Sequence, residues 1–132
     1  MTCPNCGADV VAFAVSEDLR EHAPAPIAAI CTRCLGVYSA AEAGIDPEAV
    51  SPGSDPDLTA VDPAFPTGDA GVALALMCGL LESYALNRAG IESLLEHAER
   101  HGADVFAFLE RLDAGEATFD LERRRQVLLE SL

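Results

Sequence analysis

The stretch CPNCG at residues 3–7 decides how the first third of this chain folds, because the same CxxC spacing occurs again in CTRCLG at residues 31–36. Two residues between two cysteines make a tight turn that lets both sulfurs reach one ion. The position after the second cysteine favours a positive φ, which suits Gly7. Two such turns supply the four thiolates of a tetrahedral zinc site. The spacing therefore predicts one structural Zn²⁺ bound by four residues: Cys3, Cys6, Cys31 and Cys34.

Three other interpretations of the paired cysteines fit less well. A rubredoxin-like iron site uses the same ligands, but such cores are rich in aromatic residues, and residues 1–45 offer only Phe13 and Tyr38. Thioredoxin-like redox chemistry needs its CxxC at the start of a helix within a βαβ pattern. Unligated cysteines that only pack would not fall into paired spacing. Four thiolates also leave no open position on zinc, so the predicted ion is not catalytic.

Outward from the cysteines, the chain divides into three segments, and the predicted fold class is α+β. Residues 1–45 contain short β-branched runs and predict a zinc ribbon built on a short β-hairpin. Residues 46–69 hold five of the eight prolines, six acids and no base, which predicts an acidic, solvated linker. Its end can pack down, because Phe65 stands just before a helix start and could serve as a hydrophobic staple. Residues 70–132 carry helical periodicity and predict an all-α bundle of three or four helices.

The first predicted helix, residues 69–88, is apolar on nearly every side and should lie in the middle of the bundle. The pattern does not decide whether Gly90 separates it from the next helix. The three shorter helices could cover only two faces of this central one. A homodimer or a protein partner is therefore expected to cover the third. The alternative is that Phe65, Phe106 and the ribbon cover that face and leave a monomer.

The later helices carry start signals of their own. Asp104 is the expected N-cap of a helix whose apolar residues recur every three to four positions up to Leu112. Thr118 and Asp120 are alternative caps for the last helix. These signals place two helix starts without saying how the helices pack.

The charge of the chain is its most unusual bulk property. Twenty-two acids face eight bases, all of them arginine, for a formal net charge of −14. Such a surface repels itself at low salt and is screened at high salt. The composition predicts an acidic cytoplasmic protein of a halophilic organism. Acidity of this origin covers the whole surface, so it does not indicate a basic partner.

Other features that could carry chemistry have plainer explanations. The longest small or apolar run, residues 70–81, is shorter than the roughly 20 residues that span a bilayer, so no membrane segment is expected. His97 and His101 lie four residues apart, but no third ligand is evident, and a solvated helix face is expected. Cys78 is expected to pack as a small hydrophobe. We therefore expect no enzyme, no catalytic or cofactor-binding residue and no small-molecule substrate.

The chain resembles an uncharacterised family of small haloarchaeal zinc-ribbon proteins. The resemblance is carried by CPNCG, DLREHAP, CTRC, AFPTGDAGVALALMCGLL, NRAGIESLLEHAERHGADVFAFLERL and DLERRRQ. It covers nearly the whole chain except parts of the acidic segment. It implies a zinc site at the same four cysteines and a halophilic source, and it implies no activity.

Two functions fit these observations. The first is a protein-interaction or adaptor module with a structural zinc. The second is a nucleic-acid-associated regulator of transcription or translation that uses the zinc ribbon. Nucleic-acid binding relies on clustered Lys and Arg, and residues 1–45 carry only Arg20 and Arg33 against five acids. The arginine cluster at residues 123–125 is flanked by the acids Asp120, Glu122 and Glu130 and should stabilise a solvated helix face. The interaction module is therefore favoured.

Overall fold

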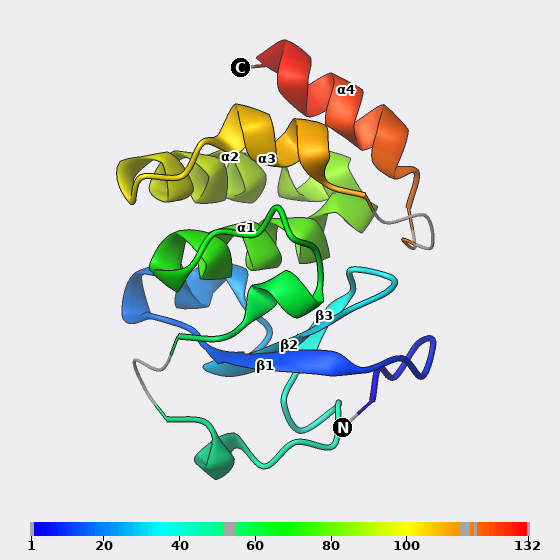
Figure 1. Ribbon diagram of the computed structural model, residues 1–132, viewed down its shortest axis with the longest axis vertical. Helices are drawn as coiled ribbons and strands as arrows, with labels where there is room; N and C mark the ends of the chain where they lie inside the picture. Colours follow the sequence, from blue (N-terminus) through cyan, green and yellow to red (C-terminus); the bar gives the residue numbers. More distant parts are fainter. Residues whose placement is uncertain (1, 52–54, 114–116, 118, 132) are drawn as a thin grey trace.

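The chain folds as stacked layers (Figure 1). Helix α1 lies in the middle, with a three-stranded sheet on one side of it. Helices α2 and α3 lie on its other side, and α4 packs beyond them. The computed structural model describes residues 2–51, 55–113, 117 and 119–131. The strands are β1 (Val10–Ala14), β2 (Ile27–Cys31) and β3 (Val37–Ser39), and the helices are α1 (Gly68–Leu80), α2 (Tyr84–Arg100), α3 (Val105–Arg111) and α4 (Leu121–Ser131).

The sheet is antiparallel in the order β1-β2-β3. The α+β class is thus confirmed, with four α-helices among the described residues, but the short hairpin predicted for the ribbon has a third strand. Phe13 on β1 lies opposite Ala28 on β2, and both are fully buried in the core. The register also places Val10 opposite Cys31. This pairing brings the start of β1, and with it the first CxxC turn, next to the second.

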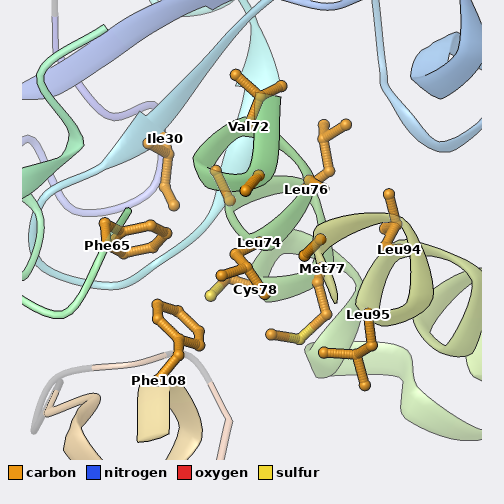
Figure 2. Packing of buried hydrophobic residues seen from close by; sticks show 14 of the residues in the cluster. Ile30, Phe65, Val72, Leu74, Leu76, Met77, Cys78, Leu94, Leu95 and Phe108 are labelled. Carbon is orange, nitrogen blue, oxygen red and sulfur yellow. The ribbon is translucent and has the colours of Figure 1, made fainter. Parts of the chain in front are cut away.

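The central helix α1 is buried from every side, as residues 70–78 all are. Figure 2 shows why it needs no polar face: Ile30 from the sheet, Leu94 from α2 and Phe108 from α3 surround it. The sheet supplies the cover that three short helices could not. The uncovered α1 face, from which we expected a homodimer or a partner, does not occur in the described structure.

The sheet and the helices share one hydrophobic core. Phe13 from β1 and Leu74 from α1 belong to the same cluster of buried residues. α1 lies close against the sheet at Gly79, where an added Cβ would lie 2.6 Å from the Cβ of Val37 on β3. A side chain at that position would push the helix away from the strand. The core therefore crosses the boundaries of the three sequence segments.

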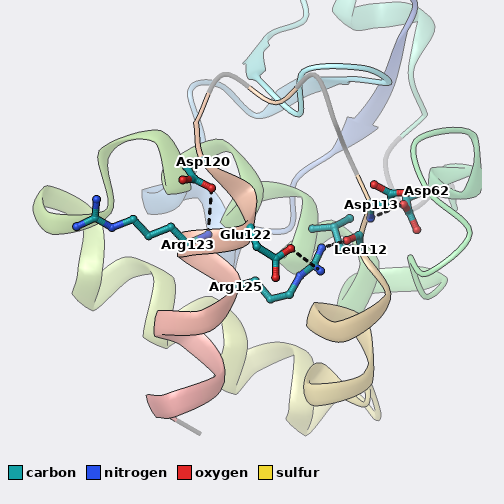
Figure 3. Close-up of polar contacts among 7 residues, drawn as sticks. All are labelled: Asp62, Leu112, Asp113, Asp120, Glu122, Arg123 and Arg125. Carbon is teal, nitrogen blue, oxygen red and sulfur yellow. Dashed lines mark hydrogen bonds and ion pairs between the residues drawn. The ribbon is translucent and has the colours of Figure 1, made fainter.

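Part of the segment at residues 46–69 returns to this core. Phe65 is 4% exposed, and its ring meets the ring of Phe108 edge to face at 4.9 Å between centroids. Asp62 is also buried and accepts a hydrogen bond from the backbone N–H of Asp113 at 3.0 Å (Figure 3). The burial of Phe65 agrees with its expected role at the packed end of the segment. The burial of Asp62 was not expected, because proline and acid content does not show which acidic side chains pack back.

α1 and α2 form an antiparallel helical hairpin. The chain reverses through the 3-10 turn Leu81–Ser83, so the first helix ends earlier than the predicted residue 88. Gly90, where the sequence allows the helix to end, lies inside α2. The apolar periodicity runs through the turn without a proline or a helix-ending glycine, and this is why the sequence did not locate it.

The same hairpin accounts for a helical stretch with membrane-like composition. Gly68–Arg100 spans 33 residues and is, by length and composition alone, apolar enough to cross a membrane. However, 56% of its most apolar window is buried inside the fold. Asp69 and His97 approach within 2.7 Å, whereas a straight helix would hold them about 40 Å apart. The stretch is folded back on itself as the centre of the core.

α3 and α4 begin at residues that cap them. Asp104 accepts a hydrogen bond from the N–H of Ala107 at 3.0 Å, as its predicted N-cap role requires. Asp120 accepts one from the N–H of Arg123 at 3.1 Å (Figure 3). Thr118, the alternative cap, lies outside the described residues.

The arginine run at residues 123–125 is partly drawn into the fold. Arg124 donates from Nε to the carbonyl oxygen of Leu81 at 3.0 Å. Arg125 donates to the carbonyl oxygen of Leu112 at the end of α3 (Figure 3). These two side chains tie α4 to the preceding helices, where the sequence predicted a solvated face.

Candidate metal centre

The two CxxC turns share one backbone geometry. In the first turn, the backbone N–H groups two and three residues after Cys3 point at its sulfur, at 3.4 and 3.5 Å. In the second turn, the equivalent N–H groups lie 3.3 and 3.4 Å from the sulfur of Cys31. Hydrogen bonds of this kind favour the charged thiolate form of cysteine. Each turn thus prepares its first cysteine to bind a cation.

The similarity extends to the residues that close each turn. The N–H of Cys3 donates to the carbonyl oxygen of Ala8 at 2.8 Å, and the N–H of Cys31 donates to that of Gly36 at 2.9 Å. Gly7 has the predicted positive φ, at 77°. The matching position in the second turn is Leu35, at 62°, the one non-glycine residue with positive φ among those described. The sequence did not reveal this strain, because leucine is no signal for a left-handed backbone.

The four cysteines predicted as ligands come together at one point. The sulfurs of Cys3 and Cys34 lie 3.7 Å apart, those of Cys6 and Cys31 lie 3.4 Å apart, and all four lie within 4.8 Å of one another. A tetrahedral site with Zn–S bonds of 2.3 Å has edges of about 3.8 Å. The separations are far longer than a disulfide bond of about 2.05 Å, and all four thiols are free. The cluster has the size of a four-thiolate metal site.

The ionisation of the thiols also favours a cation. Burial raises the pKa of Cys31 to about 12. At Cys3 burial acts in the same direction, but the N–H groups of Cys6 and Asn5 outweigh it and lower the pKa to about 6. Burial raises the pKa of Cys34 as well, and the charge of Cys3 adds to that rise. Burial thus disfavours the thiolate form of Cys31 and Cys34, and a positive ion between the sulfurs would favour it.

The surroundings of the cluster are closed on one side. Cys3, Cys31 and Cys34 are buried, whereas Cys6 is exposed to solvent. Tyr38 on β3 packs against the buried side, and its hydroxyl helps to lower the pKa of Cys3. Sequence reasoning did not identify Tyr38 as part of the site, because only the pairing of β3 with β2 brings it there.

Comparison with known proteins identifies the family. A family model described as a family of unknown function (DUF6276) matches residues 2–132. The chain belongs to this family. Neither the comparison with curated proteins nor the comparison with solved structures returned a match. DUF6276 carries no activity or ligand over to the chain, so the site is argued from its own geometry.

Proposed function

We propose that the four cysteines bind one Zn²⁺ and that this ion is structural. The observation that carries the proposal is the near-tetrahedral convergence of four free sulfurs from two turns of matching geometry. When bound, zinc would offset half of the thiolate charge and fix the ends of β1 and β2. Because four protein ligands fill its coordination shell, it would have no position for a substrate or a water. We propose no enzymatic activity for this centre.

Metal analysis tests this proposal directly. Protein purified under reducing conditions should contain one zinc per chain, and replacement of Cys3 or Cys31 by Ser should abolish it. Cys78→Ser is the matched control, because Cys78 is fully buried in α1 and lies outside the cluster. One iron per chain, with the visible absorption of an iron–thiolate centre, would contradict the zinc assignment. Zinc retained in both ligand variants would contradict the site.

For the role of the whole chain, we propose a protein-interaction module. Two of its helices each expose a large apolar side chain, Leu86 on α2 at 89% and Phe106 on α3 at 51%. Two arginines of the only basic cluster in the sequence, Arg124 and Arg125, are engaged within the fold. A surface with a net charge of −14 also repels phosphate backbones. These features favour a protein partner over nucleic acid, which remains the second candidate.

Affinity capture with surface variants distinguishes the two candidates. The tagged chain would be used as bait in extracts of its source organism, in molar KCl, with and without nuclease. A protein partner should persist after nuclease and be lost with Leu86→Glu or Phe106→Glu. Ala85→Glu is the control, since it adds the same charge at an exposed neighbouring position. Partners that disappear with nuclease, or nucleic acid recovered with the bait, would favour the regulator.

A further inference from the structure

A second cluster of metal-binding side chains lies at the open end of the α1–α2 hairpin. Asp69 stands in the first turn of α1, and His97 and His101 stand at the end of α2. Nε2 of His97 lies 2.7 Å from Oδ2 of Asp69, and Nε2 of His101 lies 3.9 Å from the same oxygen. The three ligand atoms all lie within 4.8 Å of one another. None of these residues belongs to the segment that carries the four clustered cysteines.

The sequence interpretation of these histidines is corrected by this geometry. His97 is 6% exposed, so it does not stand on a solvated helix face. The third ligand that seemed to be missing is Asp69, which lies 28 residues earlier in the chain. Only the reversal of the chain between α1 and α2 brings it within reach.

His101 is oriented so that one ring nitrogen can accept a cation. Its Nδ1 lies 2.9 Å from the backbone carbonyl oxygen of His97. A carbonyl oxygen can only accept, so Nδ1 carries the proton and Nε2 of neutral His101 presents a lone pair. Metal-bound histidines typically make such a hydrogen bond through the nitrogen that does not bind the ion. The two imidazole rings are stacked, with centroids 4.2 Å apart and an angle of 22°.

We propose that Asp69, His97 and His101 bind a divalent transition-metal ion such as Zn²⁺, at a site separate from the four cysteines. Two imidazoles and one carboxylate suit zinc and its neighbours better than Mg²⁺ or Ca²⁺, which prefer oxygen ligands. Bonds of 2.0 to 2.1 Å in a tetrahedral site separate neighbouring ligand atoms by about 3.4 Å. The present separations of 2.7 and 3.9 Å lie on either side of that value. Small side-chain rotations would therefore suffice.

Binding of the ion replaces one hydrogen bond with two metal–ligand bonds. In the metal-free protein, Nε2–H of His97 donates to the carboxylate of Asp69. When the ion binds, Nε2 gives up that proton to solvent and Nδ1 of the same ring takes one up, so His97 stays neutral and offers its Nε2 lone pair, while Asp69 binds as a carboxylate. His101 adds its free lone pair. The side chains of Asp69 and His101 are 33% and 46% exposed, so the ion can enter from solvent and keep a water as a further ligand.

A purely structural hydrogen bond between α1 and α2 would explain less of this arrangement than a metal site does. One histidine is enough to hold Asp69, and His97 already does so. Nε2 of His101 faces the same carboxylate oxygen at 3.9 Å, which places two acceptors opposite each other. A cation between them resolves the repulsion. The net charge of −14 further favours binding of a cation at the surface.

Cobalt titration of the intact, zinc-loaded chain tests the proposal. Co²⁺ at a site with nitrogen and oxygen ligands gives weak d–d absorption, whereas Co²⁺ that displaces zinc from cysteines gives an intense thiolate charge-transfer band. We expect one equivalent of Co²⁺ to bind with the weak spectrum and without release of zinc. Absence of this equivalent, or appearance of the thiolate band alone, would overturn the proposal.

Matched histidine variants locate the site. His101→Gln should weaken cobalt binding by about tenfold or more, while leaving the fold intact, because the side chain is half exposed. Asp69→Asn should weaken binding to a similar extent. His22→Gln is the control, since His22 lies beside Glu21 and outside the cluster. If His101→Gln and His22→Gln bind cobalt equally well, the site is not where we place it. Thermal melting of each metal-free variant checks that lost binding does not reflect unfolding.

Discussion

Leu35 holds the same left-handed backbone in the second CxxC turn that Gly7 holds in the first, with φ values of 62° and 77°. The two residues differ in burial and in the contacts of their side-chain positions. Gly7 is exposed and meets nothing within 4 Å of where a Cβ would stand. Leu35 is 1% exposed and packs in the core shared by the sheet and the helices. The second turn thus accepts backbone strain in exchange for a buried side chain that anchors the metal site.

At Leu35, glycine should therefore destabilise the protein less than alanine does, which is the reverse of the usual order. Leu35→Ala loses buried contacts worth about 2 to 5 kcal/mol and keeps the strained φ. Leu35→Gly loses the same contacts but relieves strain of about 1 kcal/mol or more. We expect Leu35→Gly to be the more stable of the two, measured by chemical denaturation of the zinc-loaded protein.

Leu86 provides the comparison for this pair. It is exposed within α2, where glycine costs about 1 kcal/mol relative to alanine. There Leu86→Ala should be more stable than Leu86→Gly. If Leu35 follows the same order as Leu86, the left-handed backbone at Leu35 contributes no strain.

Cys78 should report whether the sheet and the helices unfold together when zinc is removed. In the zinc-loaded protein its burial in α1 raises its pKa to about 12, so it should resist alkylation at neutral pH. The zinc-bound cysteines should resist it as well. Because one core joins both parts, chelation should make all five cysteines reactive, Cys78 included. Mass spectrometry after brief alkylation measures this.

A different labelling pattern would support separate modules. If chelation exposes only the four clustered cysteines and leaves Cys78 protected, residues 70–132 fold without the ribbon, as the segment boundaries predict. The raised pKa of Cys78 adds a check on burial. Its thiol contributes stability that is complete below the unfolded pKa of about 9 and lost as pH rises towards 12. Cys78→Ala should lessen that loss.

The convergence of the four cysteines was predictable from sequence because the geometry of each pair is local. Each pair lies within a four-residue turn, and the spacing alone brings its two sulfurs to one point. Asp104 and the left-handed Gly7 were predictable for the same reason. Asp69 and His97 were not, since their contact depends on a chain reversal at residues 81–83 that no glycine or proline marks.

The central position of α1 was predictable, but its cover was not. Its composition showed that it needed apolar neighbours on every side. It left open whether the ribbon or a second chain would supply the third face, and it did not show that Ile30 and Phe13 do so. A strand shows the same alternation of apolar and polar residues whether its sheet packs on a helix or forms a separate ribbon. In the segment at residues 46–69, the rare aromatic Phe65 indicated where the chain could pack down, but its contact with Phe108 depends on tertiary packing that the sequence does not show.

Stability should depend on salt if the acidity is an adaptation to high ionic strength. Lowering KCl from about 1 M to about 0.1 M lengthens the Debye length from about 3 to about 10 Å and exposes the net charge of −14 to itself. We expect the melting temperature to fall. Neutralising the exposed Glu96, Glu99 and Glu110 to Gln should reduce that fall. A melting temperature that does not change across this range would argue against a halophilic origin.

Tyr38→Phe should weaken zinc binding without removing a ligand. The Tyr38 hydroxyl helps to keep Cys3 ionised, and loss of such an outer partner typically costs about 10- to 100-fold in metal affinity. The ring itself, which packs against the cysteine cluster, is retained in phenylalanine. Tyr84→Phe is the matched control, because the only other tyrosine lies on α2 beneath the guanidinium of Arg124. Competition with a chromogenic chelator measures both affinities. Equal zinc affinity in the two variants would show that the hydroxyl of Tyr38 does not support the site.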